Sequence, residues 1–197
     1  MGWLTAGIIW GTVILFFRAK RIGVLYFVGG AAGLAVWLIA LLYNSSLADC
    51  LGRMSGAAAH SILAGAGIEA LFFQEGTGSE IILLLGPENW TVLAITPEAS
   101  GLLEVCGYCG LLTFFPGLGI RRKAVAGAAG ITALLGANLL RLTVIGLLIR
   151  YGGRAMIFAA HTLVSRLLYF GFTVVIYWFV FTGPTLQAIR RKITDVH

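Results

Sequence analysis

The stretch GVLYFVGGAAGLAVWLIALLY, residues 23–43, decides the fold class of this chain. It contains no charged residue, and a helix of about 20 residues is enough to cross the roughly 30 Å hydrocarbon core of a bilayer. Similar apolar runs recur along the chain of 197 residues, of which 59% are hydrophobic and 11% are charged. This composition is far more apolar than that of a soluble domain, and it predicts a single all-α polytopic membrane domain over residues 1–197.

Short clusters of basic residues separate the apolar runs. Basic clusters at the ends of apolar segments are typical of cytoplasmic loops, and they do not resemble a groove for a phosphate backbone, so no nucleic acid is expected as a partner. Six of the eight acidic residues lie between Asp49 and Glu98, a region that is expected outside the cell. Nine of the 14 Lys and Arg residues form the basic clusters: Arg18/Lys20/Arg21, Arg121/Arg122/Lys123 and Arg190/Arg191/Lys192.

The charges predict about five transmembrane helices with the N-terminus outside and the C-terminus inside. Residues 1–43 form two N-terminal helices, and the first is expected to be retained because its first charges follow the apolar run. Residues 44–98 are expected to form an extracytoplasmic segment, residues 99–183 the helices that carry the candidate site residues, and residues 184–197 a cytoplasmic tail. The helices are expected over about residues 3–17, 23–43, 100–116, 124–149 and 155–182.

The extracytoplasmic segment contains two different patterns. Residues 46–73 are rich in Ala and Gly, and Asp49, Arg53 and His60 share one helical face. This pattern predicts a short amphipathic helix on or in the outer leaflet, with a sixth span and a return as the alternative. The second pattern, at residues 81–95, has two short apolar runs on either side of Gly-Pro-Glu-Asn and predicts a β-hairpin.

Ionisable residues inside the predicted spans mark candidate functional positions, because each costs about 2.5 to 3.5 kcal/mol at the centre of a spanning helix. Arg141 is expected near the outer surface, about 25 Å above Ala124 at roughly 1.5 Å per residue. Asn138 precedes Arg141 by three positions and shares its helical face. His161 and the sequence Glu98-Ala99-Ser100-Gly101 are expected at the same level. For any one of these residues alone, a hydrogen bond between packed helices is the simpler interpretation.

Two further charges are expected one level deeper. Glu104 lies five residues beyond Ala99, and Arg166 lies five residues beyond His161. Both should therefore lie about 7 to 8 Å beneath the site. Because an unpaired charge at that depth is expensive, the sequence predicts an ion pair between Glu104 and Arg166.

The three cysteines offer thiols at other positions. Cys106 and Cys109 form Cys-Gly-Tyr-Cys, about 10 to 15 Å below Ala99, where thiols in apolar surroundings are inert. Packing is the better interpretation of these two residues and of Cys50, and no metal ion and no cofactor is predicted. A thiol oxidoreductase that uses Cys106 and Cys109 is the alternative.

The sequence Asn138-Leu139-Leu140-Arg141, followed in the next helix by His161, resembles the motifs of the exosortase and archaeosortase family of membrane-embedded cysteine transpeptidases. The closing YWFVFT, residues 177–182, is similar to the end of the small G-type subfamily, and the resemblance covers about residues 90–183. The family has Cys-Ser-Gly before these motifs, where this chain has Ala99-Ser100-Gly101. The resemblance therefore places a nucleophilic cysteine at position 99.

An alanine at this position has two explanations, an engineered replacement of a native cysteine or a naturally inactive homologue. The presence of Asn138, Arg141 and His161 favours replacement. With a cysteine at position 99, the resemblance implies a thioacyl intermediate, with His161 as the proton carrier. Arg141, oriented by Asn138, would stabilise an oxyanion or hold a substrate carboxylate. The remaining candidates are supporting residues: Glu98, Ser100, Glu104 and Arg166.

The resemblance also implies the partner. It would be a membrane-anchored protein with a C-terminal sorting signal, made of a short motif, a transmembrane helix and a basic tail. Such a substrate would reach the extracytoplasmic site by lateral diffusion in the bilayer of a prokaryotic plasma membrane. The alternative function is a catalytically inactive membrane protein that binds such a peptide tail without cleaving it.

Overall fold

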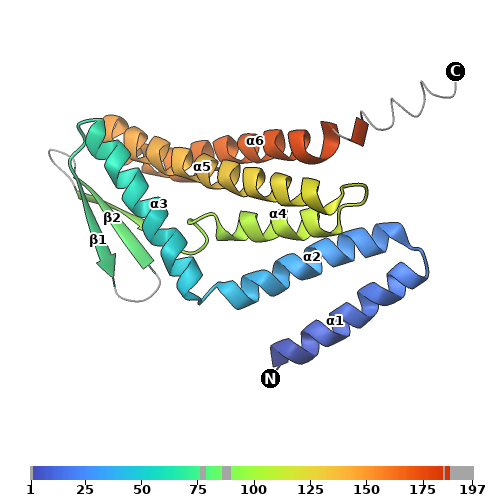
Figure 1. Ribbon diagram of the computed structural model, residues 1–197. Helices are drawn as coiled ribbons and strands as arrows, with labels where there is room; N and C mark the ends of the chain where they lie inside the picture. Colours follow the sequence, from blue (N-terminus) through green and yellow to red (C-terminus); the bar gives the residue numbers. More distant parts are fainter. Residues whose placement is uncertain (1, 76–78, 86–89, 184, 187–197) are drawn as a thin grey trace, which may run out of the picture.

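The computed structural model describes residues 2–75, 79–85, 90–183 and 185–186, and it is mostly helical (Figure 1). A 3-10 turn, Arg154–Met156, and a π-helical turn, Ala159–Val164, precede the last α-helix, and a second π-helical turn, Trp178–Thr182, follows it. The six α-helices are α1 (Gly2–Ala19), α2 (Gly23–Leu42), α3 (Ser46–Gly65), α4 (Leu102–Phe114), α5 (Ile120–Gly152) and α6 (Ser165–Tyr177).

Three helical segments are long and apolar enough to cross a membrane: Gly23–Leu42, Ile120–Gly152 and Thr162–Thr182. Helices form at the other two predicted spans, but their apolar parts, Thr5–Ala19 and Leu102–Phe114, are shorter. A helix of 13 residues such as α4 is about 20 Å long at roughly 1.5 Å per residue, less than the hydrocarbon thickness. The fold therefore confirms a helical chain with three candidate spans.

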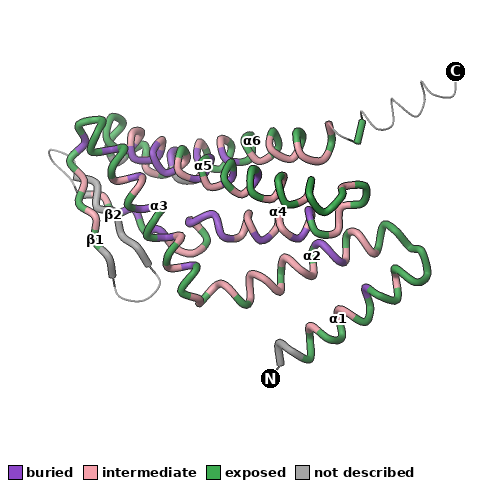
Figure 2. The backbone as a smooth tube through the Cα atoms, in the orientation of Figure 1, coloured by how far each residue is buried: buried purple, intermediate pink, exposed green. Residues whose placement is uncertain are grey.

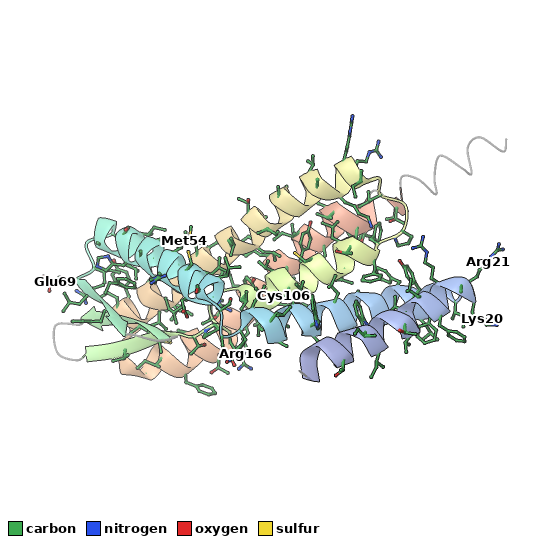
Figure 3. All side chains as sticks on the ribbon, turned by 60° about the horizontal axis from the view of Figure 1, so that its bottom comes forward. Lys20, Arg21, Met54, Glu69, Cys106 and Arg166 are labelled. Atoms are coloured by element: carbon green, nitrogen blue, oxygen red, sulfur yellow. The ribbon has the colours of Figure 1, made fainter. Side chains whose placement is uncertain are left out.

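The two ends of the bundle differ in charge. In Figure 1 the turn between α1 and α2, the loop between α4 and α5 and the end of α6 lie at one end, and α3 and the sheet lie at the other. Figure 3 shows Lys20 and Arg21 at the first end and Glu69 at the opposite end. We call these the basic end and the sheet end. The predicted cluster Arg190/Arg191/Lys192 lies outside the described residues.

The sequence predicted an all-α fold with a single β-hairpin, but the structure contains a three-stranded antiparallel sheet. Its strands are β1 (Ala70–Glu75), β2 (Ser79–Leu85) and β3 (Trp90–Ile95), in the order β1-β2-β3. The predicted hairpin is confirmed as the pair β2 and β3, but residues 70–73, which were predicted to be helical, belong to β1. Gly67 has a φ of +76°, which favours glycine and ends the helical run before the strand.

Helix α3 covers the sheet and packs against α5 rather than standing alone. Its buried face consists of small residues and one leucine, and a Cβ atom at Gly56 would overlap the ring of Phe72. Figure 2 shows buried residues where α3, the sheet and α5 meet. The core that these elements share includes Leu63, Leu93, Ile95, Leu142 and Ile145. It holds the end of β3, and therefore the turn that follows, against α5.

Candidate functional site

Ala99 lies in a tight turn between β3 and α4. The backbone amides of Ala99 and Ser100 both donate to the carbonyl of Thr96, at 2.9 and 3.0 Å. The Ser100 hydroxyl donates to the Pro97 carbonyl at 2.7 Å and accepts a bond from the Leu102 amide at 3.4 Å. Ser100 is fully buried, so its side chain stabilises the turn.

Gly101 gives this turn its shape. Its φ of +89° is a left-handed conformation that other residues adopt only with strain. A Cβ atom at this position would also lie 3.4 Å from the Asn138 side chain. Backbone geometry thus explains the Ser-Gly sequence after position 99. The Ser100 hydroxyl forms a hydrogen bond within the turn, and Gly101 adopts the positive φ with which the chain passes from the turn into α4.

Two side chains of α5 bind the backbone of residue 99. Asn138 Nδ2 and Arg141 Nη2 both donate to the Ala99 carbonyl oxygen, at 3.1 and 2.9 Å. Of the predicted cluster of Ala99, Arg141 and His161, the structure brings Ala99 and Arg141 together, with Asn138 beside them. Asn138 and Arg141 lie three positions apart on one helical face, and both side chains reach the same carbonyl.

His161 lies in the π-helical turn Ala159–Val164, and its side chain lies outside the described part of the structure. The neighbouring Ala160 is buried in the same cluster as Leu142, and Ala99 packs against that cluster. Ser165, the residue that follows this turn, lines the same hollow as Ala99. π-Helical turns occur frequently at functional sites. The predicted approach of the imidazole to position 99 stays a prediction.

A hollow of about 220 Å³ opens beside Ala99. Its charged lining comes from Glu98, Arg141 and Arg166, so arginines outnumber acids. Glu98 accepts a hydrogen bond from the Tyr43 hydroxyl at 3.0 Å. This bond and the negative charge of Glu98 raise the pKa of Tyr43. Among the described residues, the lining consists of Leu93, Ala94, Thr96, Glu98, Ala99, Arg141, Leu142, Ile145, Ser165 and Arg166.

The predicted ion pair between Glu104 and Arg166 is wrong. Arg166 is exposed and lines the hollow, while the buried Oε2 atom of Glu104 has no hydrogen-bond partner. Glu104 instead interacts electrostatically with Arg141. Equal depth does not bring two side chains face to face. The π-helical turn before α6 also rotates every later residue about the helix axis relative to a regular α-helix. The predicted depth of Arg166 assumed a regular α-helix.

The cysteines lie away from the hollow. Cys106 is 2% exposed in an apolar cluster with Ala48 and Leu102, and Cys109 is half-buried, so the packing interpretation of Cys106 is confirmed. The interpretation of Cys50 is wrong, because this residue is exposed, with its sulfur 3.9 Å from the sulfur of Met54. Within the described residues, no group of three His, Cys, Asp or Glu side chains is placed to bind a metal ion.

Tyr169 is a site residue that the sequence analysis missed. The Arg141 guanidinium carbon lies 4.9 Å from the centre of the Tyr169 ring, and Tyr169 is 6% exposed. Tyr169 lies four residues after Ser165, which lines the hollow, so both are on one side of α6, and this spacing is the signal that could have identified it. An aromatic residue in an apolar helix is otherwise indistinguishable from one that faces lipid.

No protein-family model, curated protein or solved structure matches this chain. The fold defines a mostly helical protein whose three candidate spans suggest a multi-pass membrane protein. Its distinguishing feature is a polar turn bound by Asn138 and Arg141 beside a hollow.

Proposed function

We propose that this chain has the scaffold of a sortase-like membrane cysteine transpeptidase of the exosortase and archaeosortase type, with Ala99 at the nucleophile position. The observation that supports this proposal is the binding of Asn138 and Arg141 to the carbonyl of residue 99. The buried side chain of Asn138 and the half-buried side chain of Arg141 both hold one turn residue whose own side chain is a methyl group. These two hydrogen bonds to one backbone carbonyl are explained if the side chain at position 99 must be held in a fixed place for a reaction.

The proposed reaction requires a cysteine at position 99. The thiolate adds to a peptide carbonyl of the substrate, and the tetrahedral intermediate then expels the leaving amine to give a thioacyl intermediate. His161 takes the thiol proton and passes it to that amine. An acceptor amine, or water, then attacks the thioacyl carbon, loses a proton to His161 and releases the thiol.

Arg141 has a more specific role in this proposal than the sequence suggested. One of its nitrogens donates to the carbonyl of residue 99, so the guanidinium holds the turn as well as lining the hollow. Its remaining N–H groups and its permanent charge favour a thiolate or an oxyanion nearby. Arg166, on the opposite helix of the hollow, is available to bind a carboxylate of the substrate.

The proposed orientation places the hollow on the extracytoplasmic side of a prokaryotic plasma membrane. The basic clusters between α1 and α2 and at the start of α5 both lie at the basic end (Figure 1), and they support this orientation because such clusters favour the cytoplasm. A membrane-anchored substrate with a C-terminal sorting signal would then approach by lateral diffusion. An impermeant thiol reagent should label Glu69→Cys in intact cells and leave Arg122→Cys unlabelled, and the reverse pattern would contradict the orientation.

The substitution Ala99→Cys tests the chemistry. A matched control is Ala94→Cys, because Ala94 lines the same hollow and is more exposed but is not bound by Arg141. At pH 7, we expect iodoacetamide to alkylate the thiol at position 99 about tenfold faster than the thiol at position 94, since a nearby cation favours the thiolate. Peptide-level mass spectrometry separates these sites from the native cysteines. Faster alkylation at position 94 would contradict the proposal.

The alternative function, a membrane protein that binds a peptide tail without cleaving it, is favoured by Ala99 itself. In that case the thiol introduced at position 99 would react no faster than the control at position 94. The thiol oxidoreductase is less well supported, because Cys106 packs among apolar side chains.

A further inference from the structure

The Arg141 guanidinium lies against an aromatic ring as well as a carbonyl. Its central carbon is 4.9 Å from the centre of the Tyr169 ring, within the range in which a cation is attracted to the face of an aromatic ring. Tyr169 belongs to α6, whereas the Ala99 carbonyl belongs to the turn before α4. Arg141 therefore bridges two elements, and each of them limits where its guanidinium can lie.

The ring of Tyr169, rather than its hydroxyl, makes the contact. The Tyr169 hydroxyl is buried and has no hydrogen-bond partner among the residues that the structure describes. A buried polar group without a partner is costly, and it is retained where another requirement outweighs that cost. The aromatic face beside Arg141 is the contact by which Tyr169 can affect the site.

A charge on α4 completes the surroundings of Arg141. Glu104 interacts electrostatically with Arg141, and within the described residues its buried Oε2 atom has no hydrogen-bond partner. Glu104 supplies a counter-charge without a direct ion pair, so it attracts the guanidinium without fixing its orientation. The flat ring of Tyr169 is the contact that can fix the plane.

We propose that Tyr169 is a positioning residue, whose ring holds the Arg141 guanidinium in the plane from which it donates to the carbonyl of residue 99. This inference rests on the proposed function. It adds a residue of α6 to the site and links α6, through Arg141, to the turn that carries residue 99. Movement of α6 would then change the surroundings of the nucleophile position through Arg141.

The test uses the full chain with Ala99→Cys and measures the pH midpoint of iodoacetamide alkylation at position 99. We compare Tyr169→Leu, which removes the ring, with Tyr169→Phe, which keeps it. Tyr177→Phe is the control on the same helical segment, and Arg141→Met gives the midpoint without the cation. Glu98, Glu104 and Arg166 are unchanged in every variant, so their effects on the midpoint are shared.

We expect Tyr169→Leu to raise the midpoint by about one pH unit towards the Arg141→Met value, as loss of a nearby opposite charge does. Tyr169→Phe and Tyr177→Phe should leave it unchanged. The proposal is overturned if Tyr169→Leu behaves as the parent while Arg141→Met raises the midpoint, or if Tyr169→Phe raises it as much as Tyr169→Leu. If Tyr169→Leu does not fold, Tyr169→Met replaces it, because its long flexible side chain fills space without an aromatic face.

A second measurement separates this proposal from the proposed function. We measure thermal unfolding in detergent for Tyr169→Leu, Arg141→Met and the double variant, all with Ala99 retained. This measurement tests the contact between Arg141 and Tyr169 without a thiol at position 99. We expect the double variant to lose less in Tm than the two single losses together, since each single change already breaks the same contact. Additive losses overturn the positioning role. Non-additive losses, together with an alkylation midpoint that neither Tyr169→Leu nor Arg141→Met changes, leave the contact intact and contradict the proposed function instead.

Discussion

Two regions of the bundle bury tyrosines in different ways. Around the site, Tyr169 has an unpartnered hydroxyl, whereas towards the basic end Tyr108 is completely buried and donates to the Ala126 carbonyl at 2.7 Å. Tyr108 is surrounded by rings, with Tyr177 and Phe181 both at centroid distances of 5.8 Å. We call these regions the site region (Ala99, Asn138, Arg141 and Tyr169) and the aromatic region (Tyr108, Phe115, Tyr177 and Phe181).

The two regions differ in how many buried polar atoms lack a hydrogen-bond partner, which lowers the stability of the folded protein. The four buried side-chain atoms without a partner in the described residues all lie in or beside the site region: Glu104 Oε2, Asn138 Oδ1, Arg141 Nε and Tyr169 Oη. Such groups are avoided in a core that serves packing alone, because each one loses its hydrogen bonds to water. The aromatic region closes the bundle, and the site region keeps polar atoms that packing does not require.

The largest expected effect is at the aromatic region. A Cβ atom at Gly130 would overlap the ring and hydroxyl of Tyr108, which is held by its bond to Ala126. Gly130→Ala should destabilise the protein by about 1 to 3 kcal/mol, as overpacking of a filled core does. Gly136→Ala on the same helix is the control, because nothing lies within 4 Å of its Cβ position. Thermal unfolding in detergent should separate the two variants; equal Tm values would show that the aromatic region is loosely packed.

The two tyrosines give a direct comparison of the regions. Tyr108→Phe should lower stability by about 1 kcal/mol, because it removes a buried hydrogen bond. Tyr169→Phe should be neutral or slightly stabilising, because the hydroxyl that it removes has no partner. Chemical denaturation of both variants against the parent checks the order. A larger loss for Tyr169→Phe would mean that its hydroxyl is satisfied in the folded protein and that the contrast between the regions does not hold.

A smaller effect should distinguish the two arginines that line the hollow. Glu104→Gln combined with Arg141→Met should show a coupling of about 0.5 kcal/mol or more, since these charges interact in the same site region. Glu104→Gln combined with Arg166→Met should be additive, because the structure shows no ion pair there. Double-mutant cycles on thermal stability measure both. If Glu104 were coupled to Arg166 and not to Arg141, the ion pair that the sequence predicted would be supported.

The smallest expected effect lies at the rim of the hollow. Tyr43 donates to Glu98, and its pKa is raised by that bond. A raised pKa in the folded state means that the bond stabilises the protein below the normal tyrosine pKa of about 10 and is lost as the pH rises through the raised value. Tyr43→Phe should therefore lower Tm slightly at pH 8, with the difference from the parent shrinking at higher pH. A difference that grows with pH would contradict this assignment.

Local patterns predicted the elements well where the pattern was continuous. The helices near residues 3–17, 23–43 and 124–149 form close to their expected positions, as does the hairpin of β2 and β3. The first strand was missed because Ala70–Phe73 continues the apolar composition of α3, and only pairing with β2 shows that it is extended. The π-helical turn around His161 was also missed, because its wider hydrogen-bonding pattern leaves no mark in composition.

The sequence by itself determined that this chain is an apolar helical bundle, and that Ala99, Asn138 and Arg141 share a level. Apolar length and spacing along a helix are local properties, so both can be read without knowing how the helices pack. Only the tertiary structure decided which side chains face one another. In it, Arg141 donates to the carbonyl of residue 99 and lies against the ring of Tyr169, whereas Arg166 lines the hollow. The physical reason is that contact depends on the rotation of each helix about its axis, which is set by packing across the bundle.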